Sequence, residues 1–189
     1  MSIKKVISLI TALLIVSGSP GNYSFFQEAG KSLIAHAAED EEGEEVTNEQ
    51  FRYIKYTDHI EIAEYLSSDT EVSIPAEIDS LPVTVIGDMA FRYNSSVMSI
   101  SLPESITKIG SDSFLYCTSL LDIKIPNSVT EIGSYAFGSC SSLKEIDFPD
   151  SISEISSSLL SGCTSLTEII IPASVTAIRE SAFVDCESL

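Results

Sequence analysis

Apolar residues recur through the second half of the chain at a fixed step of 23 residues. One recurring segment has the form VTxIGxxAF, in which a valine or isoleucine begins each copy and a phenylalanine or leucine follows eight positions later. The five copies begin at Val83, Ile106, Val129, Ile152 and Val175. A constant period without insertions indicates a structural unit that stacks on copies of itself, because one unit alone cannot bury its apolar side. The pattern therefore predicts a solenoid.

A second recurring segment, LxxIxIP, precedes each copy of the first. Its alternation of apolar and polar residues places the fourth and sixth positions on one side of a strand and the fifth on the other. The proline ends the strand because it cannot donate the next ladder hydrogen bond. The expected strands lie within Val72–Pro75, Val97–Pro103, Leu120–Pro126, Leu143–Pro149 and Leu166–Pro172. They would stack about 4.8 Å apart as a parallel sheet on the concave face, with short irregular or helical turns on the convex side.

The rest of the chain divides into smaller regions around this repeat array. Residues 83–189 contain five copies of the repeat, and the last copy is truncated. Leu189 is the first residue of what should be another strand. We therefore expect the native protein to continue, or this chain to be a fragment. Residues 51–82 are expected to form an N-terminal cap that contains the first strand. Residues 38–50 are strongly acidic, and like charges at this density resist compaction, so a disordered linker is expected there.

Residues 1–37 are typical of an export signal. Lys4 and Lys5 precede the apolar stretch Val6–Val16, which is too short to span a bilayer, since a spanning helix needs roughly 20 residues. A small-x-small site at Ala35–Ala37 is a plausible cleavage point. We expect a secreted or cell-surface protein without membrane insertion after cleavage; a retained membrane anchor is the alternative.

The charge of the chain limits its partners. The formal net charge is −18, and signal cleavage would remove three lysines and only one glutamate. Such a surface repels phosphate groups, so nucleic acids and anionic membranes are not expected as partners. Positively charged protein patches or cations fit this charge better, although solubility alone would also explain it.

No set of residues supports catalysis or a cofactor. The four cysteines share one repeat position, where Asn94 stands in the first copy; they are Cys117, Cys140, Cys163 and Cys186. This predicts a buried row of thiols that act as small apolar side chains, with disulfides between adjacent turns as the alternative. Zinc-type Cys and His spacings, phosphate loops and HExxH are missing from the sequence. His59 is the only histidine left after signal cleavage, and no nucleophile can be placed beside it. We expect no enzyme, no cofactor and no metal.

The strand ending in proline, followed by VTxIGxxAFxxC and the next strand, resembles the BspA-type leucine-rich repeats of bacterial surface and secreted proteins. The resemblance extends from about Val72 to Leu189 and implies a β-rich leucine-rich-repeat solenoid. Departures such as Ser156 and Arg179 in place of the repeat glycine affect turn details. Members of the family differ in adhesion, matrix-binding and accessory roles, so the resemblance implies no particular ligand.

The most promising surface lies on the predicted sheet. Asp122, Glu145 and Glu168 share one strand position, and the neighbouring row contains Ser101, Lys124, Asp147 and Ile170. Acids about 4.8 Å apart could in principle perform acid–base chemistry. On an open sheet they stay solvated, with nothing to separate their pKa values. The expected partner-binding residues on the concave face are Asp122, Lys124, Glu145, Asp147, Glu168 and Ile170.

The sequence therefore predicts an exported, non-catalytic module that binds a protein or a glycan at the cell surface, with an adhesion-like role. The alternatives are an accessory segment of a larger secreted enzyme or enzyme complex, and a spacer that holds another domain away from the wall. The ligand and the oligomeric state are left open.

Overall fold

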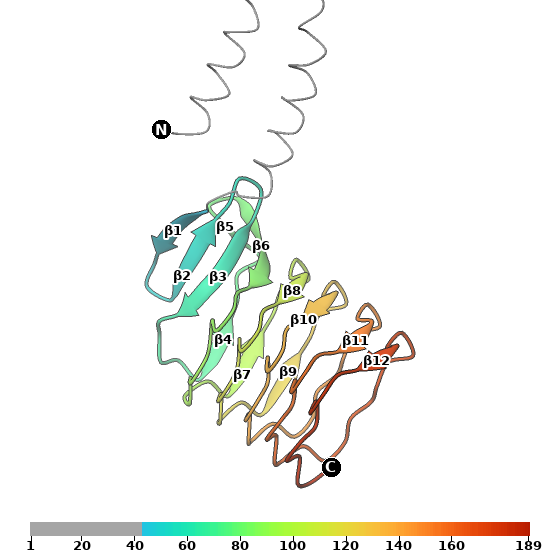
Figure 1. Ribbon diagram of the computed structural model, residues 1–189. Helices are drawn as coiled ribbons and strands as arrows, with labels where there is room; N and C mark the ends of the chain where they lie inside the picture. The colour runs from blue at the N-terminus through green and yellow to red at the C-terminus, as the bar shows by residue number, and fades with distance from the viewer. Residues whose placement is uncertain (1–42) are drawn as a thin grey trace, which may run out of the picture. The chain divides into compact units, whose positions relative to one another are not determined.

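Short strands recur along residues 43–189, the part of the chain that the computed structural model describes (Figure 1). The strands are β1 (Glu44–Thr47), β2 (Phe51–Lys55), β3 (Ile60–Tyr65), β4 (Glu71–Ser73), β5 (Glu77–Ile78), β6 (Leu81–Ile86), β7 (Ser99–Ser101), β8 (Lys108–Ile109), β9 (Asp122–Lys124), β10 (Glu131–Ile132), β11 (Glu154–Ile155) and β12 (Ala177–Ile178). The expected signal peptide, residues 1–37, and residues 38–42 of the expected linker lie outside the described residues.

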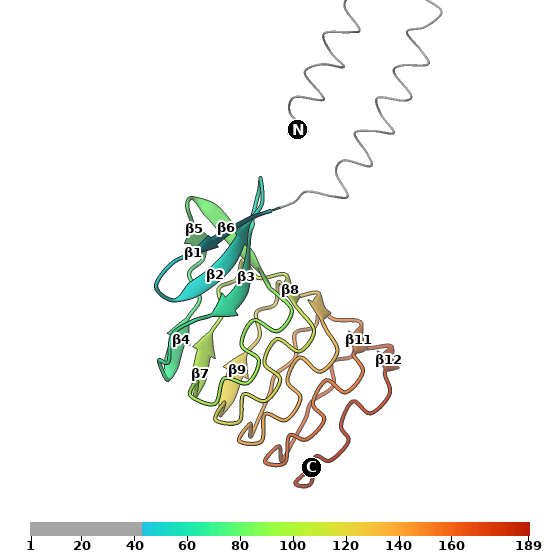
Figure 2. The same cartoon turned by 60° about the vertical axis from the view of Figure 1, so that its left-hand side comes forward.

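Successive turns of the chain build two parallel sheets. The first, β4–β7–β9, consists of the LxxIxIP segments and aligns Val72 with Ile100 and Ile100 with Ile123. The second consists of the VTxIG segments, with β6, β8 and β10 in one ladder and β11 and β12 in another. The two sheets lie on different sides of the winding chain (Figures 1 and 2). The 23-residue step is therefore one complete turn, and the predicted solenoid of parallel strands is confirmed.

The first sheet becomes narrower along the solenoid. Strands were expected within Leu143–Pro149 and Leu166–Pro172, but each contributes a single bridging residue, Asp147 and Ile170. The backbone hydrogen bonds between turns become longer in the same direction. Leu121 N lies 3.0 Å from Met98 O, and Thr167 N lies 3.4 Å from Lys144 O. The register of the repeats is kept while the regular ladder shortens.

The turn after each VTxIG strand is irregular, and residues 43–189 contain no helix. Each turn uses two residues with positive φ, a conformation that L-residues rarely adopt. In the turns after β6, β8, β10, β11 and β12 these residues have φ between 52° and 77°; they are Met89, Asp112, Tyr135, Ser158 and Ser181, and then Tyr93, Tyr116, Ser139, Gly162 and Asp185. Hydrogen bonds between turns hold this geometry, as when Tyr93 N donates to Leu115 O at 2.8 Å and Tyr116 N donates to Gly138 O at 2.9 Å.

A column of stacked rings runs through the core. Tyr65, Phe91, Phe114 and Phe137 follow one another with ring centroids 5.0, 5.1 and 5.3 Å apart. The three phenylalanines are buried, and Leu160 occupies the same position in the next turn. Stacked aromatic pairs stabilise a fold beyond the area that they bury. The phenylalanines at the constant 23-residue spacing therefore align successive turns as well as fill the core between them.

The segment expected as an N-terminal cap, residues 51–82, begins with a β-element. β2 and β3 form an antiparallel pair, and β3 continues the second sheet by pairing in parallel with β6. Ile60 and Ile62, both in β3, are fully buried in the core. Before the first complete repeat, β5 and β6 form an antiparallel pair in which Glu77 lies opposite Pro82 and Ile78 opposite Leu81.

The prediction of a disordered linker over residues 38–50 is wrong for Glu44–Thr47. These residues form β1, which pairs antiparallel with β2. Val46 packs on the core, and the carboxylate of Glu45 lies 3.4 Å from the guanidinium of Arg52. Neutralisation by a cross-strand arginine and burial of one apolar side chain together outweigh the local acidity.

Candidate functional site

The first sheet exposes the residues that the sequence analysis assigned to partner binding. Backbone alternation buries Ile123 and Ile146 and turns the residues on either side of them outward. The exposed set is Asp122, Lys124, Glu145, Asp147, Glu168 and Ile170, which we call the sheet face. Lys124 is the register partner of Asp147, and Asp147 is the register partner of Ile170. The structure therefore brings the predicted residues together on one surface.

The charges of the sheet face have no partners among residues 43–189. None of its four carboxylates and its one ammonium group forms a salt bridge there. On the second sheet, by contrast, charges pair between turns: Lys108 Nζ lies 3.0 Å from Glu131 Oε1, and Arg179 Nε donates to Glu154 Oε2 at 2.9 Å. The sheet face thus keeps its charged groups available, and Ile170, 65% exposed, adds an apolar contact.

The cysteine row is a structural part of the core. Each thiol donates to a backbone carbonyl of the preceding turn, from Cys117 to Phe91 O at 3.1 Å and from Cys140 to Phe114 O at 3.2 Å. All four cysteines are free, so the prediction of structural thiols is confirmed. Burial raises the pKa of Cys117 and of Cys163 to about 12, which leaves these groups as neutral thiols at physiological pH.

His59 is held by its neighbours in the cap. Its Nδ1 lies 2.6 Å from Asp58 Oδ1, and its ring stacks on Tyr56 with centroids 4.5 Å apart. The hydrogen bond from His59 lowers the pKa of Asp58. Within residues 43–189 no group of three His, Cys, Asp or Glu side chains could hold a metal ion.

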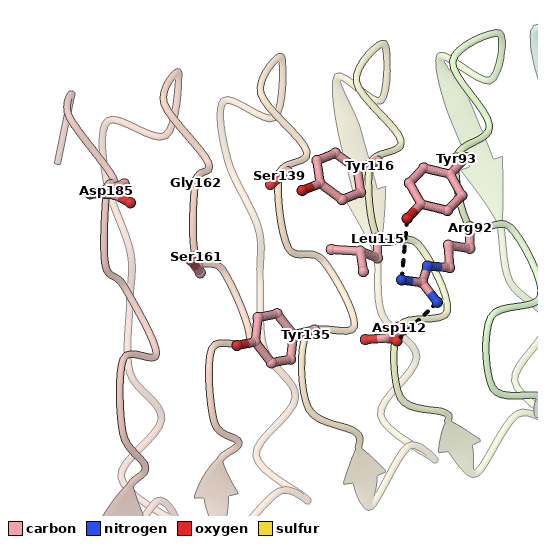
Figure 3. A pocket seen from close by; sticks show the side chains of 10 residues that line it. All are labelled: Arg92, Tyr93, Asp112, Leu115, Tyr116, Tyr135, Ser139, Ser161, Gly162 and Asp185. Carbon is pink, nitrogen blue, oxygen red and sulfur yellow. Dashed lines mark hydrogen bonds and ion pairs between the residues drawn. The ribbon is translucent and has the colours of Figure 1, made fainter.

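A second candidate surface lies on the turn side, where the sequence analysis assigned no site. An open hollow of about 580 Å³ crosses the turns that follow β6, β8, β10, β11 and β12 (Figure 3). Tyr116 and Tyr135 border it, Ser139, Ser161 and Gly162 form its floor, and Asp112 and Asp185 lie near its ends. Tyr93 and Tyr116 stack beside it with ring centroids 5.2 Å apart and planes 14° apart.

The sequence pattern and the turn-by-turn register identify the family. Residues 65–189 match the BspA type leucine rich repeat region in six copies. The chain belongs to this family. The match contains one copy more than the five counted in the sequence, because it begins inside the segment assigned to the cap. The resemblance stated above is therefore confirmed, and proteins built from BspA-type repeats are repeat modules suited to binding.

Solved structures of leucine-rich-repeat proteins share the fold. The Treponema pallidum leucine rich repeat protein is 37% identical, with a TM-score of 0.72 over 77% of this chain and 69% of that one. A leucine rich cell surface protein of Faecalibacterium prausnitzii is 29% identical, with a TM-score of 0.60 over 75% of this chain and 46% of that one. A leucine-rich repeat protein of Eubacterium ventriosum is 25% identical, with a TM-score of 0.63 over 76% of this chain and 40% of that one. The chain thus spans less than half the length of the last two proteins. No curated protein matches it.

The BspA-type repeat itself explains why the hollow was missed. Its border is formed by positions that vary between copies: Tyr116 is followed one turn later by Ser139, and Leu115 by Gly138. The sequence signal for the hollow was this sudden loss of side-chain volume at two adjacent positions in one turn.

Residues 43–189 contain no helix that is long and apolar enough to cross a membrane.

Proposed function

We propose that this BspA-type chain is an exported, non-catalytic module that binds a protein partner at the bacterial cell surface through its sheet face. The observation that carries the proposal is the contrast between the two sheets. Charges on the second sheet pair with each other between turns, whereas those of the sheet face have no partner within the described part of the chain.

The chemistry of the sheet face favours a basic protein partner. The sheet face carries four carboxylates and one ammonium group, that of Lys124, and the chain as a whole is strongly acidic. Complementary charge accelerates association and selects among partners more than it adds affinity. The exposed side chain of Ile170 supplies apolar area of the kind that the core of a protein interface buries.

Export and surface location rest on separate support. Residues 1–37 have the charge and apolar pattern of a signal peptide, and the similar Faecalibacterium protein is described as a cell surface protein. Intact-mass analysis of the protein secreted by a bacterial host tests this part. We expect the mass to lack residues 1–37; an unprocessed, membrane-associated chain would contradict it.

A charge-reversal variant tests the sheet face. Asp122→Lys, Glu145→Lys and Glu168→Lys together should reduce affinity for a basic extracellular-matrix protein by about tenfold or more, because attraction becomes repulsion. Biolayer interferometry with immobilised residues 43–189 and a panel of purified matrix proteins provides the measurement.

The matched control reverses three exposed acids elsewhere, Glu49, Glu104 and Asp150, and changes the net charge by the same amount. It should bind as the wild type does. Equal binding by the wild type and the sheet-face variant would show that the sheet face is not the interface. Equal losses in both variants would show that only the net charge matters. Binding to no matrix protein on the panel would favour the accessory or spacer role.

A further inference from the structure

The hollow on the turn side opens where a row of tyrosines ends. Along the solenoid one position of this row is occupied by Tyr93, Tyr116, Ser139, Gly162 and Asp185 in turn. Tyr116 stacks on Tyr93, and its hydroxyl group points toward the turn of Ser139 (Figure 3). Because Ser139 is too small to continue the stack, the ring of Tyr116, which is 44% exposed, has no aromatic neighbour at this position in the next turn.

The neighbouring row deepens the same place. Leu115 is followed one turn later by Gly138 and then by Ser161, so the bulk of the row falls away beside the ring of Tyr116. A Cβ atom added to Gly138 would lie 2.8 Å from Leu115 Cδ1, which shows how closely the leucine packs against the glycine backbone. Tyr135, 45% exposed, borders the other side of the hollow.

Arg92 and Asp112 hold the tyrosine end of the hollow through contacts within the protein. The guanidinium of Arg92 lies 4.9 Å from the centroid of the Tyr93 ring, and its Nη1 lies 3.5 Å from Asp112 Oδ2. A cation beside an aromatic face and an ion pair to the next turn hold these side chains in place. A ligand that binds there loses less free energy to ordering the protein.

Polar groups without partners line the floor. The hydroxyl groups of Ser139 and Ser161 form no side-chain hydrogen bond within residues 43–189, and Asp185 has no ion-pair partner there. Each can therefore exchange bound water for a ligand hydroxyl group. A volume of about 580 Å³ lies within the range of roughly 300–1,000 Å³ that is usual for small-ligand sites.

We propose that this hollow binds an uncharged oligosaccharide. An open ring face is electron-rich and attracts the C–H-rich face of a pyranose. Serine hydroxyls and a carboxylate are suitable partners for sugar hydroxyl groups. The carboxylates of Asp112 and Asp185 and the acidity of the whole chain disfavour phosphorylated or sulfated ligands. The open shape fits a segment of a chain that lies across several turns. This site is separate from the sheet face and does not depend on it.

Substitutions that copy residues from other turns test the site with little risk to folding. Tyr116→Ser introduces the residue that the next turn has at Ser139, and Tyr135→Ser introduces the residue that the next turn has at Ser158; both have positive φ. Ser139→Tyr does the opposite, since it extends the stack into the hollow and fills it. A thermal midpoint equal to that of the wild type shows that each variant is folded.

Isothermal titration of residues 43–189 with cello-, chito-, manno- and galacto-hexasaccharides, and with heparin hexasaccharide, provides the measurement. We expect at least one neutral hexasaccharide to bind and heparin hexasaccharide not to bind. All three variants should weaken that binding by about tenfold or more, and the sheet-face variant should bind as the wild type does. The proposal is overturned if no neutral hexasaccharide binds, if the anionic one binds best, or if Tyr116→Ser and Ser139→Tyr bind as the wild type. Loss in the sheet-face variant alone would place the sugar on the sheet face instead.

Discussion

At the scale of single residues, the repeat position of a side chain determines its chemistry. Four cysteines at one position become four buried or half-buried thiols, each donating to a carbonyl of the previous turn. This outcome could be predicted from the sequence, because a position shared by every turn of a stack faces the same interior wherever another turn covers it. Cys186, in the last turn, is less buried than the other three cysteines.

Alkylation should distinguish the thiols. With iodoacetamide at pH 8 the folded chain should be modified at Cys186 first, while the other three stay protected because burial raises their pKa and covers their sulfur atoms. Mass spectrometry of peptides gives the sites. In urea all four should react, and Cys186→Ser should leave the folded protein almost unreactive. Equal modification of all four in the folded protein would contradict this packing.

At the scale of elements, simple alternation predicted the exposure of the six sheet-face residues, whereas local charge misled the prediction at β1. The six sheet-face residues are exposed because every second residue of a strand points the same way. β1 was missed because its pairing with β2 depends on Arg52 and on the partial burial of Val46 against the core, neither of which the acidic segment reveals by itself. Long-range pairing overrides local composition in the cap.

Glu61 in β3 should make the cap sensitive to pH. Its carboxylate lies against Gly87, where an added Cβ would be 2.5 Å from Oε1, and burial, followed by the nearby charge of Asp88, raises its pKa. A raised pKa in the folded state means that the folded chain holds the proton more tightly than the unfolded chain. This contribution to stability is therefore present below the unfolded-state pKa and is lost as pH rises through the folded-state pKa.

The variant Glu61→Gln removes this titration. At neutral pH it should be more stable than the wild type, because the buried charge is gone, and the difference should shrink as pH falls below the folded-state pKa of Glu61. Urea unfolding at several pH values measures the difference. Exposed Glu64→Gln, whose side chain pairs with Arg52, is the control and should not be stabilising. A Glu61→Gln variant less stable than wild type at neutral pH would contradict the account.

At the scale of the whole molecule, the 23-residue period determines the architecture, and the variable positions create its binding surfaces. The period alone predicted the solenoid, because insertion-free repeats must stack in register. The hollow could not be predicted in the same way. It depends on side-chain volumes that drop at Gly138 and Ser139 while the repeat pattern continues, and on which tyrosine face Tyr93 covers.

The central claim, that the sheet face is the protein-binding surface, is tested most directly by hydrogen–deuterium exchange of residues 43–189 with and without a matrix protein that binds. We predict slower exchange in the peptides that contain Asp122–Lys124, Asp147 and Ile170, and unchanged exchange in those that contain β10 and β11. Protection confined to the second sheet, or spread equally over both, would contradict the account.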